Sequence, residues 1–278
     1  GVYQHSTVAR DLFVSVLAYY GAEAVVLGRS DSFIPVDTEA VSSETVTLLQ
    51  GWAVQHGLDA IISADGDGDR PLVTDETGTP VRGDLIGLIA CRFLGATAIA
   101  TPVTSNSGIE AAVDGAVLRT RVGSPFVIAA MNDAVAAGEK AVSGFEANGG
   151  TLTATPFTVN GHALTPLPTR DSLMPVLAVL ALAAGQKRPL STIAAGFALP
   201  AAASDRLENF PVETSAALMA ELRSGAGALA AFLAPLGVPS KVSDIDGLRV
   251  TLESGDVVHL RPSGNAPEMR CYVEARDD

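Results

Sequence analysis

The sequence predicts an α/β protein with two units of related architecture, each built on a mixed or parallel sheet, followed by a smaller α+β unit. Short apolar runs alternate with helical patterns in the first part of the chain, which is typical of parallel strands joined by right-handed crossovers. The same alternation is repeated in outline after residue 95. Only the last part alternates apolar and polar residues around a Ser-Gly turn, which indicates an antiparallel hairpin. We therefore expect domains at 1–95, 96–199 and 200–278.

In the first unit, a helix is expected from about residue 7, with Ser6 as its N-cap and Gly21 just beyond its end. The apolar runs and helical patterns that follow predict a strand at 22–28, a helix at 38–57, a strand at 59–65 and a helix at 84–95.

In the second unit, the pair Ser124-Pro125 predicts a helix start, with serine as N-cap and proline in the first turn. The other expected elements are a strand at 96–103, a loop and helix at 105–116, a strand and turn at 116–123, and an apolar helix at 171–185. In the third unit we expect a glycine-interrupted helix at 214–237, a hairpin at 246–264 and a strand at 268–276.

The composition is that of a globular protein with large cores, because 47% of the 278 residues are hydrophobic and 18% are charged. A net charge of −13 argues against a nucleic-acid or anionic-membrane partner. The apolar run 173–185 is too short to span a membrane, and no secretory signal opens the chain. Cys91 and Cys271 lie in helical and strand-like runs, which favours reduced thiols and a cytoplasmic setting.

A run of aspartates ends the predicted strand at 59–65. Asp65, Asp67 and Asp69 stand at alternate positions, and the two intervening glycines let the backbone curl so that the three carboxylates converge. Carboxylate oxygens are the ligands that Mg²⁺ and Ca²⁺ prefer, and uncompensated carboxylates at this spacing would repel one another. The stretch therefore predicts a site for a hard divalent cation.

Two other interpretations of these aspartates remain open. Counted from Asp65, an EF-hand loop would find an acidic ligand at Glu76, but its required glycine is Arg70 and the preceding run is a strand rather than a helix. The second alternative is a solvated acidic turn without an ion.

The stretch 261–270 could surround a phosphate group. Arg261 and Arg270 supply guanidinium groups, and Ser263 with the amides around Gly264 and Asn265 supplies further hydrogen-bond donors. A glycine-containing loop with solvated arginines is an equally good interpretation of this stretch alone.

Two weaker candidates lie in the second unit. Glu146 and Asn148, on a glycine-flanked loop that we expect to be flexible, offer the polar groups that a hydroxyl-rich ligand requires. Arg121 precedes a helix N-terminus, a place that favours anions, although a surface ion pair is the simpler interpretation of an isolated arginine.

Taken together and in this order, the stretches resemble the phosphohexomutase family, which includes phosphomannomutases, phosphoglucomutases and phosphoglucosamine mutases. The resemblance rests on "DGDGDR" (65–70), "TRVG" (120–123), "GFEANGG" (144–150) and "RPSGNAPEMRCYVEA" (261–275). The opening "GVYQHSTVARDLF" and "VDTEAV" (36–41) are similar to bacterial phosphomannomutases.

The resemblance implies an isomerase in which a phosphoserine gives its phosphoryl group to a hexose 1- or 6-phosphate, with a hexose 1,6-bisphosphate as intermediate and activator. It also implies roles for residues of this chain. These are Mg²⁺ ligation by Asp65, Asp67 and Asp69, catalytic support by Arg70 and Arg121, sugar contacts by Gly123, Ser124, Glu146 and Asn148, and phosphate binding by Arg261, Ser263, Gly264, Asn265 and Arg270.

The sequence departs from the family pattern in three places. Asn265 replaces the usual threonine, and Arg121 replaces a common lysine; arginine stays protonated and is a poor general base. No stretch resembles the "TASHNP"-type loop that carries the phosphoserine, and the chain begins with Gly1 rather than Met. We therefore expect the last three domains of such an enzyme, without its N-terminal serine-loop domain and inactive alone. The alternatives are a non-catalytic module that binds metal and sugar phosphate, and a calcium-binding structural protein. By resemblance of the sugar loop we expect mannose phosphate as the substrate, with glucose and glucosamine phosphates as the alternatives.

Overall fold

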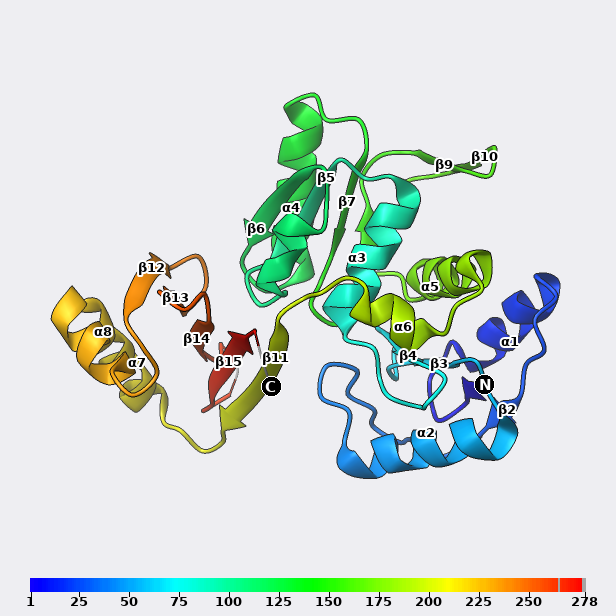
Figure 1. Cartoon of the computed structure of the whole chain (residues 1–278), viewed down its shortest axis with the longest axis horizontal. Coiled ribbons are helices and arrows are strands. Elements are labelled where there is room, and N and C mark those ends of the chain that lie inside the picture. Colours follow the sequence, from blue (N-terminus) through cyan, green and yellow to red (C-terminus); the bar gives the residue numbers. More distant parts are fainter. Residues whose placement is uncertain (265, 277–278) are drawn as a thin grey trace.

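The computed structural model describes residues 1–264 and 266–276, which form three units arranged side by side (Figure 1). The first two units are α/β and the third carries an antiparallel sheet with two helices, so the predicted fold class is confirmed. The domain boundaries at residues 95 and 199 stay predictions. The main hydrophobic core crosses the first boundary, because it joins Phe13 and Ile62 to Ile99 and Phe145.

The first unit has a four-stranded sheet in the order β2-β1-β3-β4. Its strands are β1 (Val2–Tyr3), β2 (Val26–Leu27), β3 (Ile61–Ala64) and β4 (Pro71–Thr74), and its helices are α1 (Arg10–Tyr19) and α2 (Ser43–His56). β1 pairs in parallel with β2 and β3, whereas β4 is antiparallel to β3. The sequence did not predict β4. Because β4 follows β3 and pairs with it, the aspartate stretch is the turn of a hairpin rather than a strand-to-helix connection.

The helix ends of this unit follow the capping rules only in part. Ser6 is not the N-cap of α1, because Ala9 has that position and the Ser6 hydroxyl donates to the Ile34 carbonyl at 3.0 Å. Gly21 lies just beyond the helix with φ +78°, as predicted. In α2, the Ser42 hydroxyl accepts a hydrogen bond from the Thr45 N–H and caps the helix.

The second unit repeats the topology of the first. Its sheet order is β6-β5-β7-β8, with β5 parallel to β6 and β7, and with β8 antiparallel to β7. The strands are β5 (Ala98–Pro102), β6 (Ala116–Thr120), β7 (Val142–Phe145) and β8 (Thr151–Thr153). The helices are α3 (Gly83–Leu94), η1 (Ser107–Ala111), α4 (Ser124–Ala136), α5 (Leu173–Gln186) and α6 (Leu190–Ala195), and a separate hairpin consists of β9 (Phe157–Val159) and β10 (His162–Leu164). The predicted relationship between the two units is therefore confirmed.

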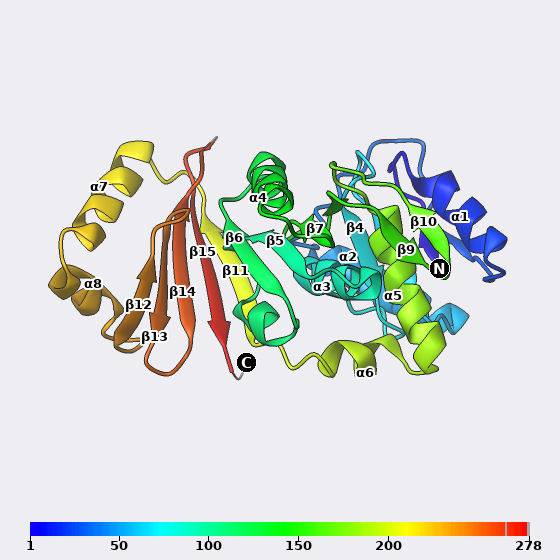
Figure 2. The same cartoon turned by 90° about the horizontal axis from the view of Figure 1, so that it is seen from above.

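The third unit is a five-stranded antiparallel sheet in the order β11-β15-β14-β13-β12. Its strands are β11 (Ala201–Leu207), β12 (Pro239–Ser243), β13 (Leu248–Leu252), β14 (Val257–Pro262) and β15 (Met269–Ala275), and its helices are α7 (Val212–Arg223) and α8 (Ala226–Leu233). Figure 2 shows α7 and α8 on the side of this sheet that faces away from the other units. Gly225 separates the two helices, as the glycine interruption predicted.

Polar contacts hold the third unit against the second. The Asn106 side-chain amide donates to the Pro200 carbonyl at 2.9 Å, and the Ser107 N–H donates to the Glu274 carboxylate at 2.9 Å. In addition, the Val122 N–H donates to Asp246 Oδ2 at 2.9 Å. These bonds set the position of β14 and β15 relative to the second sheet.

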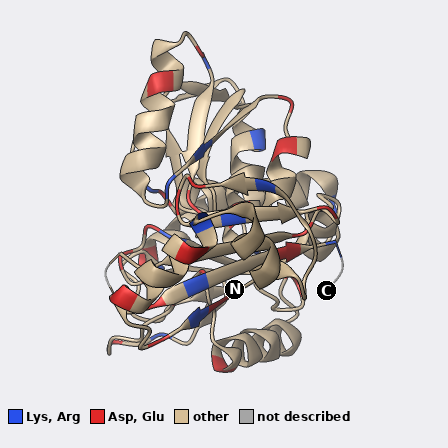
Figure 3. Cartoon of the chain, turned by 90° about the vertical axis from the view of Figure 1, so that its left-hand side faces the viewer, with Lys and Arg blue, Asp and Glu red and all other residues tan. Residues whose placement is uncertain are grey.

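Charged residues of both signs are interspersed over the side of the molecule shown in Figure 3. Cys91 and Cys271 are both free, as expected. Within the described residues, no single helix has the length and apolar character to cross a membrane. Helices α7 and α8 together have that length and apolar character, but they are bent by 111° relative to each other.

Candidate active site

Two hairpin turns, one from each related unit, form the centre of the site. The turn between β3 and β4 carries the aspartates at 65–69, and the equivalent turn between β7 and β8 carries Glu146 and Asn148. Each turn contains a glycine with positive φ, Gly68 at 78° and Gly149 at 87°, a conformation that other residues rarely adopt. The shared topology of the two sheets therefore accounts for both turns.

The aspartates of the first turn are held by the backbone and by arginine. Asp65 is buried, and its Oδ1 accepts hydrogen bonds from the N–H groups of Asp69 and Arg70, both at 3.1 Å. Its other oxygen, Oδ2, lies 2.8 Å from Arg70 Nε, and Asp69 Oδ1 lies 3.8 Å from the same atom. Asp67 is exposed. Two carboxylates thus converge on one point, which the Arg70 guanidinium occupies.

The expected convergence of all three carboxylates is not found. Within the described residues, no group of three or more His, Cys, Asp or Glu side chains is arranged to hold a metal ion. The EF-hand alternative is wrong, because the turn joins two strands and Glu76 instead accepts hydrogen bonds from the N–H and hydroxyl of Ser191. Asp69 Oδ1 is buried and accepts no hydrogen bond from the described residues, which leaves one carboxylate oxygen available at the point of convergence.

The second turn is tight and buried rather than flexible, contrary to the expectation. Glu146 is 5% exposed and Asn148 is 7% exposed. Asn148 Oδ1 accepts a hydrogen bond from the Gly150 N–H at 2.9 Å, and the Gly149 N–H donates to the Glu146 carbonyl at 2.8 Å. The start of α3 packs so closely on this turn that a Cβ at Gly83 would lie 2.4 Å from the Ala147 carbonyl oxygen.

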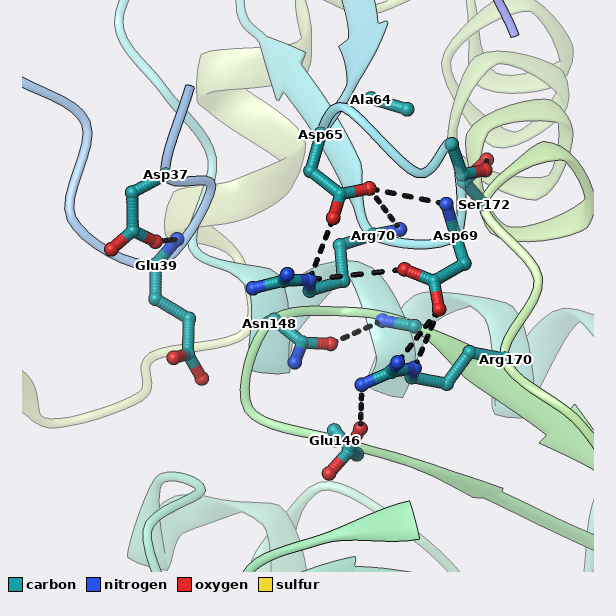
Figure 4. Close-up of polar contacts among 12 residues, drawn as sticks. Asp37, Glu39, Ala64, Asp65, Asp69, Arg70, Glu146, Asn148, Arg170 and Ser172 are labelled. Atoms are coloured by element: carbon teal, nitrogen blue, oxygen red, sulfur yellow. Dashed lines mark hydrogen bonds and ion pairs between the residues drawn. The ribbon is translucent and has the colours of Figure 1, made fainter. Parts of the chain in front are cut away.

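Arg170 joins the two turns, and the sequence did not indicate this role. Its Nη2 and Nε lie 2.7 and 2.9 Å from Asp69 Oδ2, and its Nη1 lies 2.9 Å from Glu146 Oε2 (Figure 4). Two residues further along the chain, the Ser172 hydroxyl donates a hydrogen bond to the Gly68 carbonyl at 2.7 Å. Asp69 and Glu146 are 101 and 24 positions away from Arg170 in the sequence, so no local motif reveals the contact.

The turn between β6 and α4 carries Arg121, Gly123 and Ser124. Arg121 is exposed, and its guanidinium stacks over the Phe126 ring with 4.9 Å to the centroid. Gly123, with φ +122°, is the N-cap of α4, so the prediction that Ser124 caps the helix is wrong; Ser124 is its first residue.

The phosphate stretch lies on adjacent antiparallel strands. Arg261 of β14 and Arg270 of β15 are direct cross-strand partners, and Arg206 of β11 is the partner of Arg270 on its other side. Cross-strand partners project from the same face of a sheet, so the three arginines form a row that the sequence did not reveal. Arg261 Nε lies 3.1 Å from Asp246 Oδ1, and Arg270 pairs with Glu268 at 3.5 Å.

The loop that follows Arg261 is described except for one residue. The Ser263 N–H donates to the Glu268 carbonyl at 2.9 Å. A Cβ at Gly264 would meet none of the described atoms within 4 Å, so the loop backbone is accessible there. The predicted contact of Asn265 lies outside the described residues.

A cavity of about 730 Å³ opens between the three units. Its lining comes from the segment 37–41, the start of α3 at Gly83, Ala147 of the second turn, β11 and the Arg270 end of β15. The cavity therefore brings part of the predicted sugar loop and part of the predicted phosphate loop to the same space.

Glu39 lines this cavity and is a second residue that the sequence did not single out, although it lies in "VDTEAV". Glu39 is exposed, yet the surrounding protein raises its pKa, mainly by desolvation and further by the charges of Asp37 and Glu146. Arg70 and Arg270 partly oppose that rise in the pKa, which places Glu39 within electrostatic reach of both turns and of the phosphate stretch.

Two family models match the chain. Residues 82–199 match the phosphoglucomutase/phosphomannomutase alpha/beta/alpha domain III, and residues 207–278 match the phosphoglucomutase/phosphomannomutase C-terminal domain. Among curated relatives, a phosphomannomutase of Sinorhizobium fredii is 54% identical over 277 residues, and one of Salmonella muenchen is 42% identical over 280 residues. These matches cover 100% and 99% of this chain but 58% and 57% of the relatives, so the chain spans little more than half of their length.

Solved structures show the same fold. A phosphoglucomutase/phosphomannomutase family protein of Burkholderia thailandensis superposes with a TM-score of 0.75 at 21% identity, covering 100% of this chain and 56% of that one. The Paramecium phosphoprotein parafusin, a phosphoglucomutase, superposes with a TM-score of 0.67 at 16% identity, covering 98% of this chain and 52% of that one. From the two family models, these relatives and the shared fold, we conclude that the chain belongs to the phosphoglucomutase/phosphomannomutase family of phosphohexomutases.

Proposed function

We propose that this chain forms the sugar-phosphate-binding part of a phosphomannomutase-type isomerase that interconverts hexose 6-phosphate and hexose 1-phosphate. One observation carries the proposal: the aspartate turn and the Glu146 turn are joined through Arg170 beside a cavity that Arg270 also lines. Carboxylates, sugar-binding polar groups and phosphate-binding guanidinium groups thus belong to one region. The names of the curated relatives favour mannose phosphate over glucose or glucosamine phosphate.

The non-reacting phosphate is held by the third unit. Arg261 and Arg270 lie side by side on adjacent strands and supply two guanidinium groups, which bind phosphate oxygens in a bidentate manner. Ser263 and the accessible backbone at Gly264 complete the clamp, together with Asn265. An incoming phosphate would compete with Asp246 and Glu268 for these guanidinium groups.

The sugar is held by the second unit. Glu146 accepts hydrogen bonds from sugar hydroxyls, and Asn148 both donates and accepts, so the same pair serves a hexose in either orientation. The turn at Gly123 and Ser124 lies at the start of α4, where the helix dipole favours an anionic substrate. Arg121 next to this turn contributes positive charge rather than general-base catalysis.

The first turn carries the kind of oxygen ligands that magnesium binds, although its three carboxylates do not converge in this structure. Asp65 and Asp69 direct carboxylate oxygens to one point, Asp69 Oδ1 accepts no hydrogen bond from the described residues, and Asp67 lies exposed on the same turn. Hard oxygen ligands of this kind suit Mg²⁺, so Asp65, Asp67 and Asp69 would hold it there in place of the Arg70 guanidinium. When bound, Mg²⁺ neutralises charge on the phosphoryl group in transfer.

Phosphoryl transfer in the whole protein needs a donor. We assign that role to a phosphoserine on a serine-loop domain other than the three units described here, as the greater length of the relatives suggests. Its phosphoryl group would pass to the free hydroxyl of the hexose phosphate and form hexose 1,6-bisphosphate. The bisphosphate would then turn over in the cleft and return its other phosphoryl group to the serine. Arg70 stabilises the transferring group, since its side chain lies next to the predicted cation site.

The test is a titration of this chain, in MgCl₂, with mannose 1-phosphate, mannose 6-phosphate, glucose 6-phosphate and glucosamine 6-phosphate by calorimetry. We expect binding that is weakened at least about tenfold by Arg270→Met, because a charge-assisted hydrogen bond contributes about 1.5–3 kcal/mol. Arg223→Met is the matched control, since Arg223 pairs with Asp244 at 2.8 Å on the outer side of the third unit.

A chain that binds none of these sugars more tightly than inorganic phosphate would contradict the proposal. Mutase turnover is measured separately with the full-length protein and a catalytic amount of the 1,6-bisphosphate. Binding without any turnover in that assay would favour the alternative of a non-catalytic module. The cytoplasmic location expected from the free cysteines stays a prediction.

A further inference from the structure

Hydrogen bonds of the neighbouring residue Asp171 hold the backbone at Arg170 in place. The neighbouring Asp171 exchanges two backbone hydrogen bonds with Thr151, at 2.9 and 3.1 Å. The Asp171 carboxylate also accepts hydrogen bonds from the N–H groups of Leu173 and Met174, at 2.8 and 3.2 Å, and so satisfies the first two N–H groups of α5. The stem of the arginine passes Gly150, where a Cβ would lie 3.0 Å from Arg170 Cδ. The guanidinium is therefore directed from a rigid base, between strand β8 and helix α5.

From this base, the guanidinium contacts two carboxylates with different functions in the proposed enzyme. It holds Asp69 Oδ2, so that the other oxygen of Asp69 faces Arg70 and the predicted cation site. It also holds Glu146, whose side chain is 7% exposed and has no other ion pair among residues 1–264 and 266–276. The contact between Arg170 and the two carboxylates differs from an ordinary surface ion pair, which joins two mobile side chains in solvent.

Only an arginine can make both contacts at once. Its planar guanidinium carries donors on separate nitrogens, and here Nε and Nη2 serve Asp69 while Nη1 serves Glu146. A lysine keeps the charge, but its ammonium group is a single point that cannot span the two carboxylates in the same way.

We propose that Arg170 is a positioning residue for the sugar subsite: it orients the Glu146 carboxylate toward the sugar hydroxyls and fixes the second turn on the cation-binding turn. This inference rests on the proposed function and assigns to it a residue that contacts neither the phosphate nor the cation. We therefore expect substitution of Arg170 to weaken the recognition of the sugar ring and to leave the recognition of the phosphate group unchanged.

The experiment measures affinities for mannose 6-phosphate and for inorganic phosphate by calorimetry in MgCl₂. We expect Arg170→Met to lower the affinity for mannose 6-phosphate about tenfold and to leave that for inorganic phosphate within about twofold, as loss of a charged hydrogen bond predicts. Arg170→Lys should recover part of the loss. The double variant Arg170→Met/Glu146→Gln should bind no more weakly than Glu146→Gln alone, because both changes remove the same oriented carboxylate.

Circular dichroism and the melting temperature confirm that each variant is folded, and Arg170→Lys carries the test if Arg170→Met does not fold. Arg223→Met again serves as the control, with wild-type affinities expected. Equal losses for both ligands would show a merely structural role, and additive effects of the Arg170 and Glu146 changes would show independent roles; either result overturns the inference. A wild-type chain that binds no mannose 6-phosphate counts against the proposed function. Unchanged binding in both Arg170 variants counts against the positioning role alone.

Discussion

Replacement of Gly83 by alanine sets two opposing effects against each other. Gly83 is the first residue of α3, where alanine improves helix propensity by at most about 1 kcal/mol. The added Cβ, however, would lie 2.4 Å from the Ala147 carbonyl oxygen and 2.4 Å from the Asn148 carbonyl carbon. Carbon atoms in contact are normally about 3.5–4.0 Å apart, so the second turn must move by roughly an ångström.

Overpacking of this kind typically costs about 1–3 kcal/mol, and here the opposing atoms belong to the backbone, which cannot rotate away as a flexible side chain can. We therefore expect Gly83→Ala to lower the free energy of unfolding by about 1–2 kcal/mol despite its better propensity. Because the displaced segment carries Asn148, hexose phosphate affinity should fall about tenfold.

Urea unfolding followed by circular dichroism measures the first effect, and calorimetric titration with mannose 6-phosphate measures the second. The matched control is Gly51→Ala in α2, where a Cβ would meet none of the described atoms within 4 Å. That variant should gain about 0.5–1 kcal/mol in stability and keep its ligand affinity. A Gly83→Ala chain as stable as the wild type, or more so, would refute the close packing of α3 on the sugar loop.

Three further predictions concern charged groups of the site. Arg70→Met should tighten Mn²⁺ binding to the chain about tenfold, measured by electron paramagnetic resonance, because a positive charge next to both carboxylates opposes the cation by about 1 kcal/mol or more; weaker binding would show that Arg70 supports the cation site. For Glu39, the pKa is raised in the folded chain, mainly by desolvation, so its contribution to stability is fully present below pH 4.5 and is lost as the pH rises through the higher folded-state value. The melting temperature of Glu39→Gln should therefore rise relative to the wild type between pH 4 and pH 8, and a constant difference over that range would contradict the assignment. Asp246→Ala removes an acceptor for the Val122 N–H and a partner for Arg261, and it should lower the free energy of unfolding by about 1–3 kcal/mol in urea denaturation; an unchanged value would show that the contact between the second and third units does not depend on it.

The sequence predicted elements whose signals are local. Gly21 lies just beyond α1, Gly225 separates α7 from α8, and the Ser-Gly turn joins β13 to β14, because each of these features depends on residues a few positions apart. Other strands were missed, including β1, β4 and β7 to β12. Among them, β4 and β8 are short and buried along their whole length, so they show no alternation of exposed and buried positions. The caps at Ser6 and Ser124 were wrong, because the Ser6 hydroxyl is bonded to the distant Ile34 carbonyl and the cap position of α4 has a positive φ that Gly123 adopts.

For the site, the sequence by itself determined which residue types are present and in what order: acidic residues at 65–69, polar residues at 146 and 148, and arginines at 261 and 270. Only the tertiary structure decided how they meet. The repeated sheet topology gives each unit the same hairpin turn, and Arg170 joins the two turns across 101 and 24 residues of sequence. The antiparallel register aligns Arg206 with Arg270 and Arg261. These contacts depend on the packing of whole units, and for that reason no local pattern of residues could have revealed them.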